Sequence, residues 1–233
     1  MKIFPLLSGG VDSTIAILAR MANRDFDEIH PMFINYGQKA CKQEWNSVCR
    51  VSRKLAKLIE GDTVSFHNPI RIDLSCTSID YVRIFQWSKS QLITGKLDAN
   101  PYVENRNMIL ISVASSFVES RINEHERGTI ITGFRDEWPD TQREFVTLMN
   151  RLLKFLLSDK RKIITVEAPI INFGPQGKAK MVAAFQRYKE ILDLTWSCYN
   201  PTGGKPCQKC KACRDRKQAF PHRVLWRNKD DKK

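Results

Sequence analysis

Near the start of the chain, the string Leu6-Leu7-Ser8-Gly9-Gly10-Val11-Asp12-Ser13-Thr14 has the residue types that hold an anion. Two glycines directly after an apolar run let the backbone approach an anion without a Cβ in the way. Ser8 and Ser13 can donate hydroxyl hydrogen bonds, and the N–H groups of a helix beginning here would point at phosphates. The loop is neither a Walker loop, which needs Gly-Lys-Ser/Thr, nor a dinucleotide fingerprint, which needs a third glycine.

A plainer interpretation makes the two glycines a turn between strand and helix, with Asp12 or Ser13 capping the helix. The complete run Ser-Gly-Gly-Val-Asp-Ser at the first strand-to-helix junction favours nucleotide binding instead. The residues predicted to bind the nucleotide are Leu7, Ser8, Gly9, Gly10, Val11, Asp12 and Ser13.

A second group of reactive side chains lies near the other end, where Cys198, Cys207, Cys210 and Cys213 follow one another at gaps of eight, two and two residues. Four thiolates suit tetrahedral Zn²⁺, and the two-residue gaps suit a tight knuckle, so we predict a closed, structural zinc site. An iron–sulfur cluster uses the same ligands, a redox-active Cys-x-x-Cys has the same spacing, and four unrelated buried cysteines are a further alternative.

Composition describes an ordinary globular chain with a basic surplus. The 233 residues carry a formal net charge of +13, and residues 205–233 hold eleven Lys or Arg against three Asp. Such a tail is typical of contact with nucleic acid or a partner protein, although thiolates on zinc also favour nearby positive charge. No apolar run approaches the ~18 residues of a membrane span, and the initial apolar run is too short for a signal peptide, so we expect a cytoplasmic protein.

The elements that must position these groups alternate between strand and helix. Short apolar runs predict strands at 2–7, 28–35, 63–66, 129–132 and 162–167. Helical periodicity or apolar length predicts helices at 13–23, 38–60, 107–122, 145–157 and 178–188. This alternation indicates an α/β fold with a doubly wound parallel sheet, which binds ligands at the carboxyl ends of its strands. We expect residues 1–194 to form this domain and residues 195–233 a small zinc-binding region with the basic tail.

With the two motifs at opposite ends, the chain resembles the 7-cyano-7-deazaguanine synthases, a family of the PP-loop ATP pyrophosphatase superfamily, over nearly its whole length. The matching segments are Asn35-Tyr36-Gly37-Gln38 with Glu44, Tyr102 to Asn107 ending in Arg-Asn, the loop from Gly133 to Phe145, Pro169 to Lys178, and Thr195 to Asn200.

The resemblance implies an ATP-dependent ligase that adenylates 7-carboxy-7-deazaguanine and uses ammonia to form the 7-cyano product. It implies ATP and Mg²⁺, with Asp12 helping to hold the metal, and Zn²⁺ at the cysteines. The catalytic residues would be Ser13, Arg106 and Lys178. Those that hold the deazapurine would be Tyr36, Gln38, Asp136, Asp140 and Arg143.

Two departures from the family pattern lie near the expected base pocket. Glu104 stands where the family usually has proline, and Thr141 stands where it usually has cysteine. One alternative is therefore a paralogue that transfers the activated deazaguanine to another amine, on a protein or a small molecule. A tRNA-modifying PP-loop enzyme and a zinc-knuckle nucleic-acid-binding module are further alternatives, and a homodimer is an open arrangement.

Overall fold

A parallel sheet forms the centre of the computed structural model, which describes residues 1–74, 105–174 and 177–220. A five-stranded sheet has the order β4-β2-β1-β6-β7, and β3 pairs with β5 beside it; every one of these pairs is parallel. The strands are β1 Lys2–Pro5, β2 Glu28–Ile29, β3 Met32–Asn35, β4 Ser65–Phe66, β5 Ile70–Asp73, β6 Arg127–Ile131 and β7 Ile163–Glu167.

The two sheets are one sheet with an interruption. β3 continues the line of β2 after His30 and Pro31, and Pro31 has no N–H to donate to the ladder. Three residue steps from Ile29 to Met32 lie opposite four from Phe66 to Ile70, so the outer strand holds one extra residue, as in a β-bulge. The Leu6–Met32 bridge joins both halves to β1.

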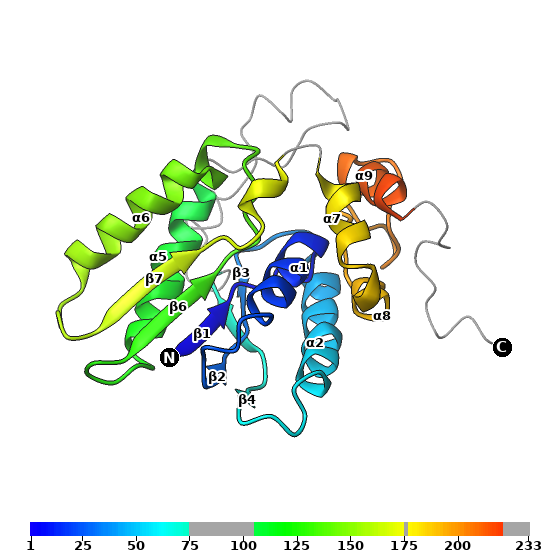
Figure 1. The fold of residues 1–233 in the computed structure, drawn as a ribbon. Helices are drawn as coiled ribbons and strands as arrows, with labels where there is room; N and C mark the ends of the chain where they lie inside the picture. Colours follow the sequence, from blue (N-terminus) through cyan, green and yellow to red (C-terminus); the bar gives the residue numbers. More distant parts are fainter. Residues whose placement is uncertain (75–104, 175–176, 221–233) are drawn as a thin grey trace.

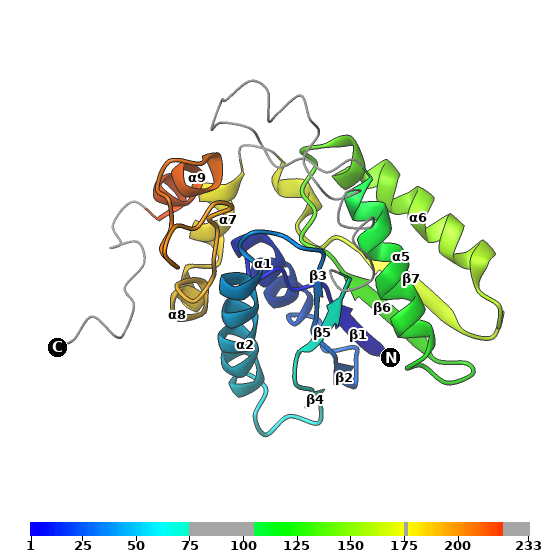
Figure 2. The ribbon, with the colours of Figure 1, turned by 180° about the vertical axis from the view of Figure 1, so that it is seen from behind.

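Helices cover both faces of the sheet (Figures 1 and 2). Ile3 of β1 belongs to a core shared with α1, α2, α7 and α8, whereas its neighbour Phe4 belongs to a core shared with α5 and α6. Successive side chains of a strand point to opposite faces, which explains the division. The helices are α1 Val11–Arg20, α2 Cys41–Lys57, α5 Arg106–Glu119, α6 Arg143–Leu156, α7 Lys178–Ala184, α8 Lys189–Leu192 and α9 Lys211–Ala219, with 3-10 turns η1 Pro139–Thr141, η2 Ile171–Phe173 and η3 Gln186–Tyr188.

The predicted doubly wound α/β fold is confirmed, with differences in single elements. The expected strand at 28–35 is broken at Pro31, and the expected helix at 178–188 ends at Ala184 and continues as η3. Strand β5 and helix α9 were not predicted, although Ile70 and Ile72 alternate with polar residues as a half-buried strand does. The polar, irregular sequence of residues 70–100 predicts an excursion from the sheet, and its part after residue 74 lies outside the described residues. Tyr102 to Glu104 and residues 221–233 of the basic tail also lie outside them.

Residues 195–220 lie against the sheet domain, where α9 packs on α7 (Figure 1). A small core of their own surrounds the cysteines and includes Trp196 and Ala212. The domain boundary at residue 194 stays a prediction. In the described parts of the chain, no helix combines the length and apolar character needed to cross a membrane.

Candidate functional site

The predicted phosphate loop (residues 7–13) joins β1 to α1 where the strand order reverses, between β1 and β6. The Oγ atoms of Ser8 and Ser13 lie 3.0 Å apart, and the Ser8 N–H donates to the Ser13 hydroxyl over 3.2 Å. Gly9 has φ +73°, and a Cβ there would lie 2.6 Å from the backbone oxygen of Glu44. Only glycine therefore suits this position, because of both its backbone conformation and its close contact with α2.

The first turn of α1 faces a cavity of about 290 Å³ at the carboxyl ends of the strands. Amide groups in the first turn of a helix have no acceptor within that helix, so those of Val11, Asp12 and Ser13 are available to an anion. Gly133 closes the loop from the other side, since a Cβ on it would lie 2.6 Å from the Ser13 nitrogen. Backbone donors and small residues thus line the floor of the cavity, as phosphate binding requires.

Two cations converge on Asp12. Lys178 Nζ lies 3.3 Å and Arg135 Nε 3.6 Å from its Oδ2. Arg135 is buried, with 6 % of its side chain exposed, and it also pairs with Glu137 at 2.6 Å and donates to the Gly174 carbonyl at 2.7 Å. The other oxygen, Asp12 Oδ1, is buried with no hydrogen-bond partner among the described residues. An orphaned carboxylate oxygen beside a phosphate loop fits Mg²⁺, which prefers such ligands.

A third cation enters from α5. Arg106 and Asn107 occupy the first turn of this helix, line the cavity, and follow Asn105, whose φ of 57° turns the chain into the helix. Tyr36 accepts a hydrogen bond from Arg106. Asn107 Nδ2 donates to Asp140 Oδ2 at 2.9 Å, so the loop after β6 is tied to α5.

The predicted substrate residues are brought together only in part. Tyr36 and Gln38 line the cavity, and Asp140 stands directly behind it through its bond to Asn107. Asp136 is exposed and is not among the lining residues. Arg143 donates to Asn172 Oδ1 at 2.6 Å and lines a separate depression beside β7. All three predicted catalytic residues, Ser13, Arg106 and Lys178, line the cavity.

Sequence reasoning gave no role to several other residues of the wall, namely Glu44, Arg135, Glu137, Trp196 and Tyr199. Arg135 lies just beyond the carboxyl end of β6, a position that in a doubly wound sheet faces the ligand. Glu44 lies in the first turn of α2, which follows the carboxyl end of β3. The rule that ligands bind at the carboxyl ends of parallel strands could therefore have selected both residues.

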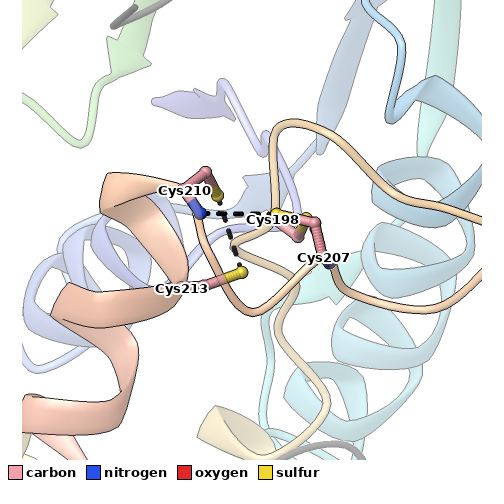
Figure 3. A group of neighbouring side chains, drawn as sticks. All are labelled: Cys198, Cys207, Cys210 and Cys213. Atoms are coloured by element: carbon pink, nitrogen blue, oxygen red, sulfur yellow. Dashed lines mark hydrogen bonds between the residues drawn. The ribbon is translucent and has the colours of Figure 1, made fainter. Parts of the chain in front are cut away.

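The four cysteines predicted to bind zinc meet in one cluster (Figure 3). Their sulfur atoms all lie within 4.8 Å of one another, and Cys210 and Cys213 are 3.5 Å apart. The Cys207 and Cys210 N–H groups donate to the sulfurs of Cys198 and Cys207 at 3.2 and 3.4 Å. All four are unpaired by disulfides. Zn–S bonds of about 2.3 Å in a tetrahedron need sulfurs somewhat under 4 Å apart, so the cluster fits zinc.

The segment around the cysteine cluster is joined to the phosphate loop by hydrogen bonds. The Trp196 N–H donates to the Gly9 carbonyl at 2.7 Å, and the Trp196 indole donates to the Cys198 carbonyl at 2.7 Å. Arg216 of α9 is buried and donates to the Thr195 hydroxyl at 2.7 Å. The segment that enters the metal cluster therefore also forms a wall of the cavity.

Glu28, His30 and His67 form another group of possible metal ligands, beside β2 and β4 and outside the lining of the cavity. Glu28 Oε2 lies 2.8 and 3.1 Å from the two imidazole Nε2 atoms. The rings stack at 3.9 Å with 10° between their planes, so their in-plane lone pairs run side by side and do not meet at one ion. The Lys2 ammonium also lies 3.5 Å from Glu28. This geometry suits hydrogen bonds to a shared carboxylate better than a shared metal.

The parallel α/β sheet, the phosphate loop after its first strand and the family match together identify the class, that of the ATP-dependent PP-loop enzymes. The chain belongs to the family described as queuosine biosynthesis protein QueC, whose model matches residues 2–224. It is 29 % identical to a 7-cyano-7-deazaguanine synthase of Methanosarcina barkeri and 30 % identical to one of Methanocaldococcus jannaschii. Each comparison covers 94 % of both chains.

Among solved structures, the fold is similar to a 4-thiouridine synthetase in complex with RNA and bound ATP. The two share 16 % sequence identity at a TM-score of 0.39, over 94 % of this chain and 50 % of the other.

Proposed function

We propose that this protein is an ATP-dependent carbon–nitrogen ligase that converts 7-carboxy-7-deazaguanine and ammonia to 7-cyano-7-deazaguanine. The observation that carries the proposal is the cavity at the phosphate loop. Hydroxyl and amide donors line its floor, and three cationic side chains, Arg106, Arg135 and Lys178, line its walls. A site of this kind stabilises a triphosphate and a carboxylate together. Both must be held side by side for ATP to activate the carboxylate. The similarity to 7-cyano-7-deazaguanine synthases supports the product.

The proposed chemistry begins by making the carboxylate electrophilic. A carboxylate oxygen attacks the α-phosphate of ATP, the bond to the β-phosphate oxygen breaks, and pyrophosphate leaves. Ammonia attacks the acyl-adenylate, AMP leaves, and the amide remains after the nitrogen loses a proton. The amide oxygen is then adenylated by a second ATP, and loss of AMP with the remaining nitrogen protons gives the nitrile. Each step needs positioning and charge stabilisation more than covalent catalysis.

Within this scheme, Ser8, Ser13 and the first-turn amides of α1 hold the phosphates, and Arg106 and Lys178 stabilise the developing charge. Asp12 would hold Mg²⁺, which supplies charge neutralisation at the phosphates. Tyr36 and Gln38 form the side of the cavity assigned to the deazapurine, and Asp140 supports it through its bond to Asn107. A role in binding the deazapurine remains a prediction from family resemblance for Asp136 and Arg143. Their exposed side chains would have to turn toward the substrate to fulfil it.

The test is to incubate the purified protein with 7-carboxy-7-deazaguanine, ATP and Mg²⁺, with and without ammonium, and to follow the products by mass spectrometry. We expect a nitrile that requires ammonium, with two AMP formed per nitrile. Asp140→Ala should weaken the apparent affinity for the deazaguanine, and Ser13→Ala should reduce ATP turnover by roughly 100-fold or more, the usual cost of losing one donor to a developing charge.

If an adenylate or an amide formed but no nitrile, the function would be transfer of the activated deazaguanine to another amine instead of nitrile synthesis. Absence of AMP formation with this substrate would contradict the proposal altogether. Full ATP turnover by Ser13→Ala would remove the role given to that hydroxyl, and unchanged substrate affinity in Asp140→Ala would remove the role given to that carboxylate.

A further inference from the structure

Three carboxyl groups line the cavity, and among the described residues two of them are held in ion pairs while the third is not. Asp12 is held by Lys178 and Arg135, and Glu137 by Arg135. Glu44 has no ion pair within 4.0 Å among the described residues. In this part of the chain, its carboxyl group is therefore not neutralised by direct contact with a cation.

The position of Glu44 is set by a short chain of hydrogen bonds. The Gln38 side-chain oxygen accepts from the Tyr36 N–H at 2.9 Å, which directs the amide NH₂ of Gln38 toward the Ile34 carbonyl at 3.3 Å and toward Glu44 Oε2 at 3.0 Å. Among the described residues only one Glu44 oxygen has a hydrogen-bond partner, so the other faces no competing donor there and is available to a ligand in the cavity. The amide of Gln38 thus fixes the carboxyl group without neutralising it.

Glu44 also stands next to the phosphate loop. A Cβ built on Gly9 would touch the Glu44 backbone oxygen at 2.6 Å, so the first turn of α2 lies directly against the loop. Among the described residues, the charged or titratable groups that interact with it are Arg106 from α5, Tyr36 after β3, Tyr199 before the cysteine cluster and Cys41 on α2. Of these, only Arg106 is a cation.

Burial raises the pKa of Glu44 to about 7, against the hydrogen bond from Gln38 and the attraction of Arg106, which lower it. A carboxyl group with such a pKa exchanges protons near neutral pH in both directions, whereas an ordinary glutamate would be almost entirely ionised.

We propose that Glu44 is the catalytic base of the amine step, an inference that rests on the proposed ligase function. As the nitrogen lone pair forms the C–N bond and the bond from the acyl carbon to the AMP oxygen breaks, Glu44 accepts the proton that the nitrogen loses. After release of this proton to water, the adenylated amide still carries two nitrogen protons. One of them passes to water, and Glu44 accepts the other as AMP leaves and the nitrile forms. The residue has no part in adenylation.

The test separates the two half-reactions in the wild type and in Glu44→Gln, which keeps the shape and the bond to Gln38. Exchange of labelled pyrophosphate into ATP, dependent on 7-carboxy-7-deazaguanine, reports adenylation, and formation of amide and nitrile reports the amine step. We expect exchange to stay within a few-fold of the wild type and product formation to fall by about 100-fold or more. Glu44→Asp should recover part of the loss, and Glu60→Gln, exposed just after the same helix, should behave as the wild type.

The pH profile provides a readout that a purely structural role would not change. At a constant concentration of unprotonated ammonia, wild-type product formation should rise through a midpoint near pH 7, as Glu44 loses its proton. The rising limb should be absent in Glu44→Gln. Equal loss of exchange and product in that variant, or product formation at the wild-type rate, would overturn the assignment. Absence of exchange in the wild type would instead refute the ligase proposal.

Discussion

At the residue scale, the carboxyl groups of the cavity differ through their surroundings and not through their chemical type. Asp12 and Glu137 lie within ion-pair distance of cations, whereas Glu44 is held by a neutral amide in a half-buried position. Removal from water disfavours the charged form unless a counter-charge compensates for it. A glutamate thus pairs with a cation at one wall, as Glu137 does, and accepts a proton at another, the role proposed for Glu44.

The raised pKa of Glu44 predicts how stability depends on pH. The pKa is about 7 in the folded state against 4.5 for the free side chain, so the contribution of Glu44 to stability is complete below pH 4.5 and is lost as the pH rises through 7. Glu44→Gln should therefore match the wild type at pH 4.5 and exceed it at pH 8, by up to about 3 kcal/mol. Denaturant unfolding at the two pH values measures the difference.

Glu60→Gln is the control for this measurement, because its exposed side chain should leave stability unchanged at both pH values. Equal stability of Glu44→Gln and the wild type at pH 8 would show that burial does not destabilise the ionised form of Glu44.

At the element scale, three segments meet at one hydroxyl. Ser47 of α2 is fully buried, and its Oγ lies 2.9 Å from the Gly9 carbonyl and 2.6 Å from the Leu194 carbonyl. The single hydroxyl proton lies between two acceptors, one in the phosphate loop and one in the segment that leads to the metal cluster. Helix α2 therefore binds the phosphate loop through Ser47 and also places Glu44 beside it.

We predict that Ser47→Ala costs about 1–3 kcal/mol of unfolding free energy, because the Leu194 carbonyl loses this donor, whereas the Gly9 carbonyl keeps the Trp196 N–H. It should also weaken ATP binding, since Gly9 loses a support. Ser52→Ala is a matched control on the same helix, because Ser52 is equally buried but its hydroxyl has no partner among the described residues. That variant should be neutral or slightly stabilising. Thermal unfolding with and without ATP measures both effects, and equal losses in the two variants would contradict the prediction.

At the scale of the whole molecule, the two large cores lie on opposite faces of the sheet, and a third, small core surrounds the cysteines. The third core has few apolar side chains, so metal binding must supply much of its stability. Because Trp196 joins it to Gly9, order in the metal cluster and order in the phosphate loop are coupled.

Removal of zinc should therefore loosen residues 195–220 while the sheet stays folded. We expect faster amide hydrogen exchange in α9 and in the phosphate loop, and ATP affinity lower by roughly 5-fold or more, the equivalent of one hydrogen bond of about 1 kcal/mol. Cys207→Ser should reproduce the effect of a chelator, and Cys49→Ser on α2 should not. Unchanged exchange in the phosphate loop after zinc loss would show that the two sites are independent.

The sequence by itself determined the features whose residues are neighbours along the chain. The glycines and serines of residues 7–13 form one loop, and the two-residue gaps among Cys207, Cys210 and Cys213 place sulfurs on one knuckle. Apolar periodicity was enough for most strands and helices, since burial of one face imposes it. Family resemblance added Arg106 and Lys178, which the structure places beside the phosphate loop.

Only the tertiary structure decided which distant groups meet and how deeply they are buried. Arg135 reaches Asp12 because β6 pairs with β1, a strand order that no local pattern encodes. Asp136, one residue further on, points to solvent instead. The pKa of Glu44 depends on solvent exclusion by α2, α5 and the segment before the metal cluster, and desolvation exists only in the folded chain. Chemistry that depends on long-range contacts and burial is therefore decided by the fold.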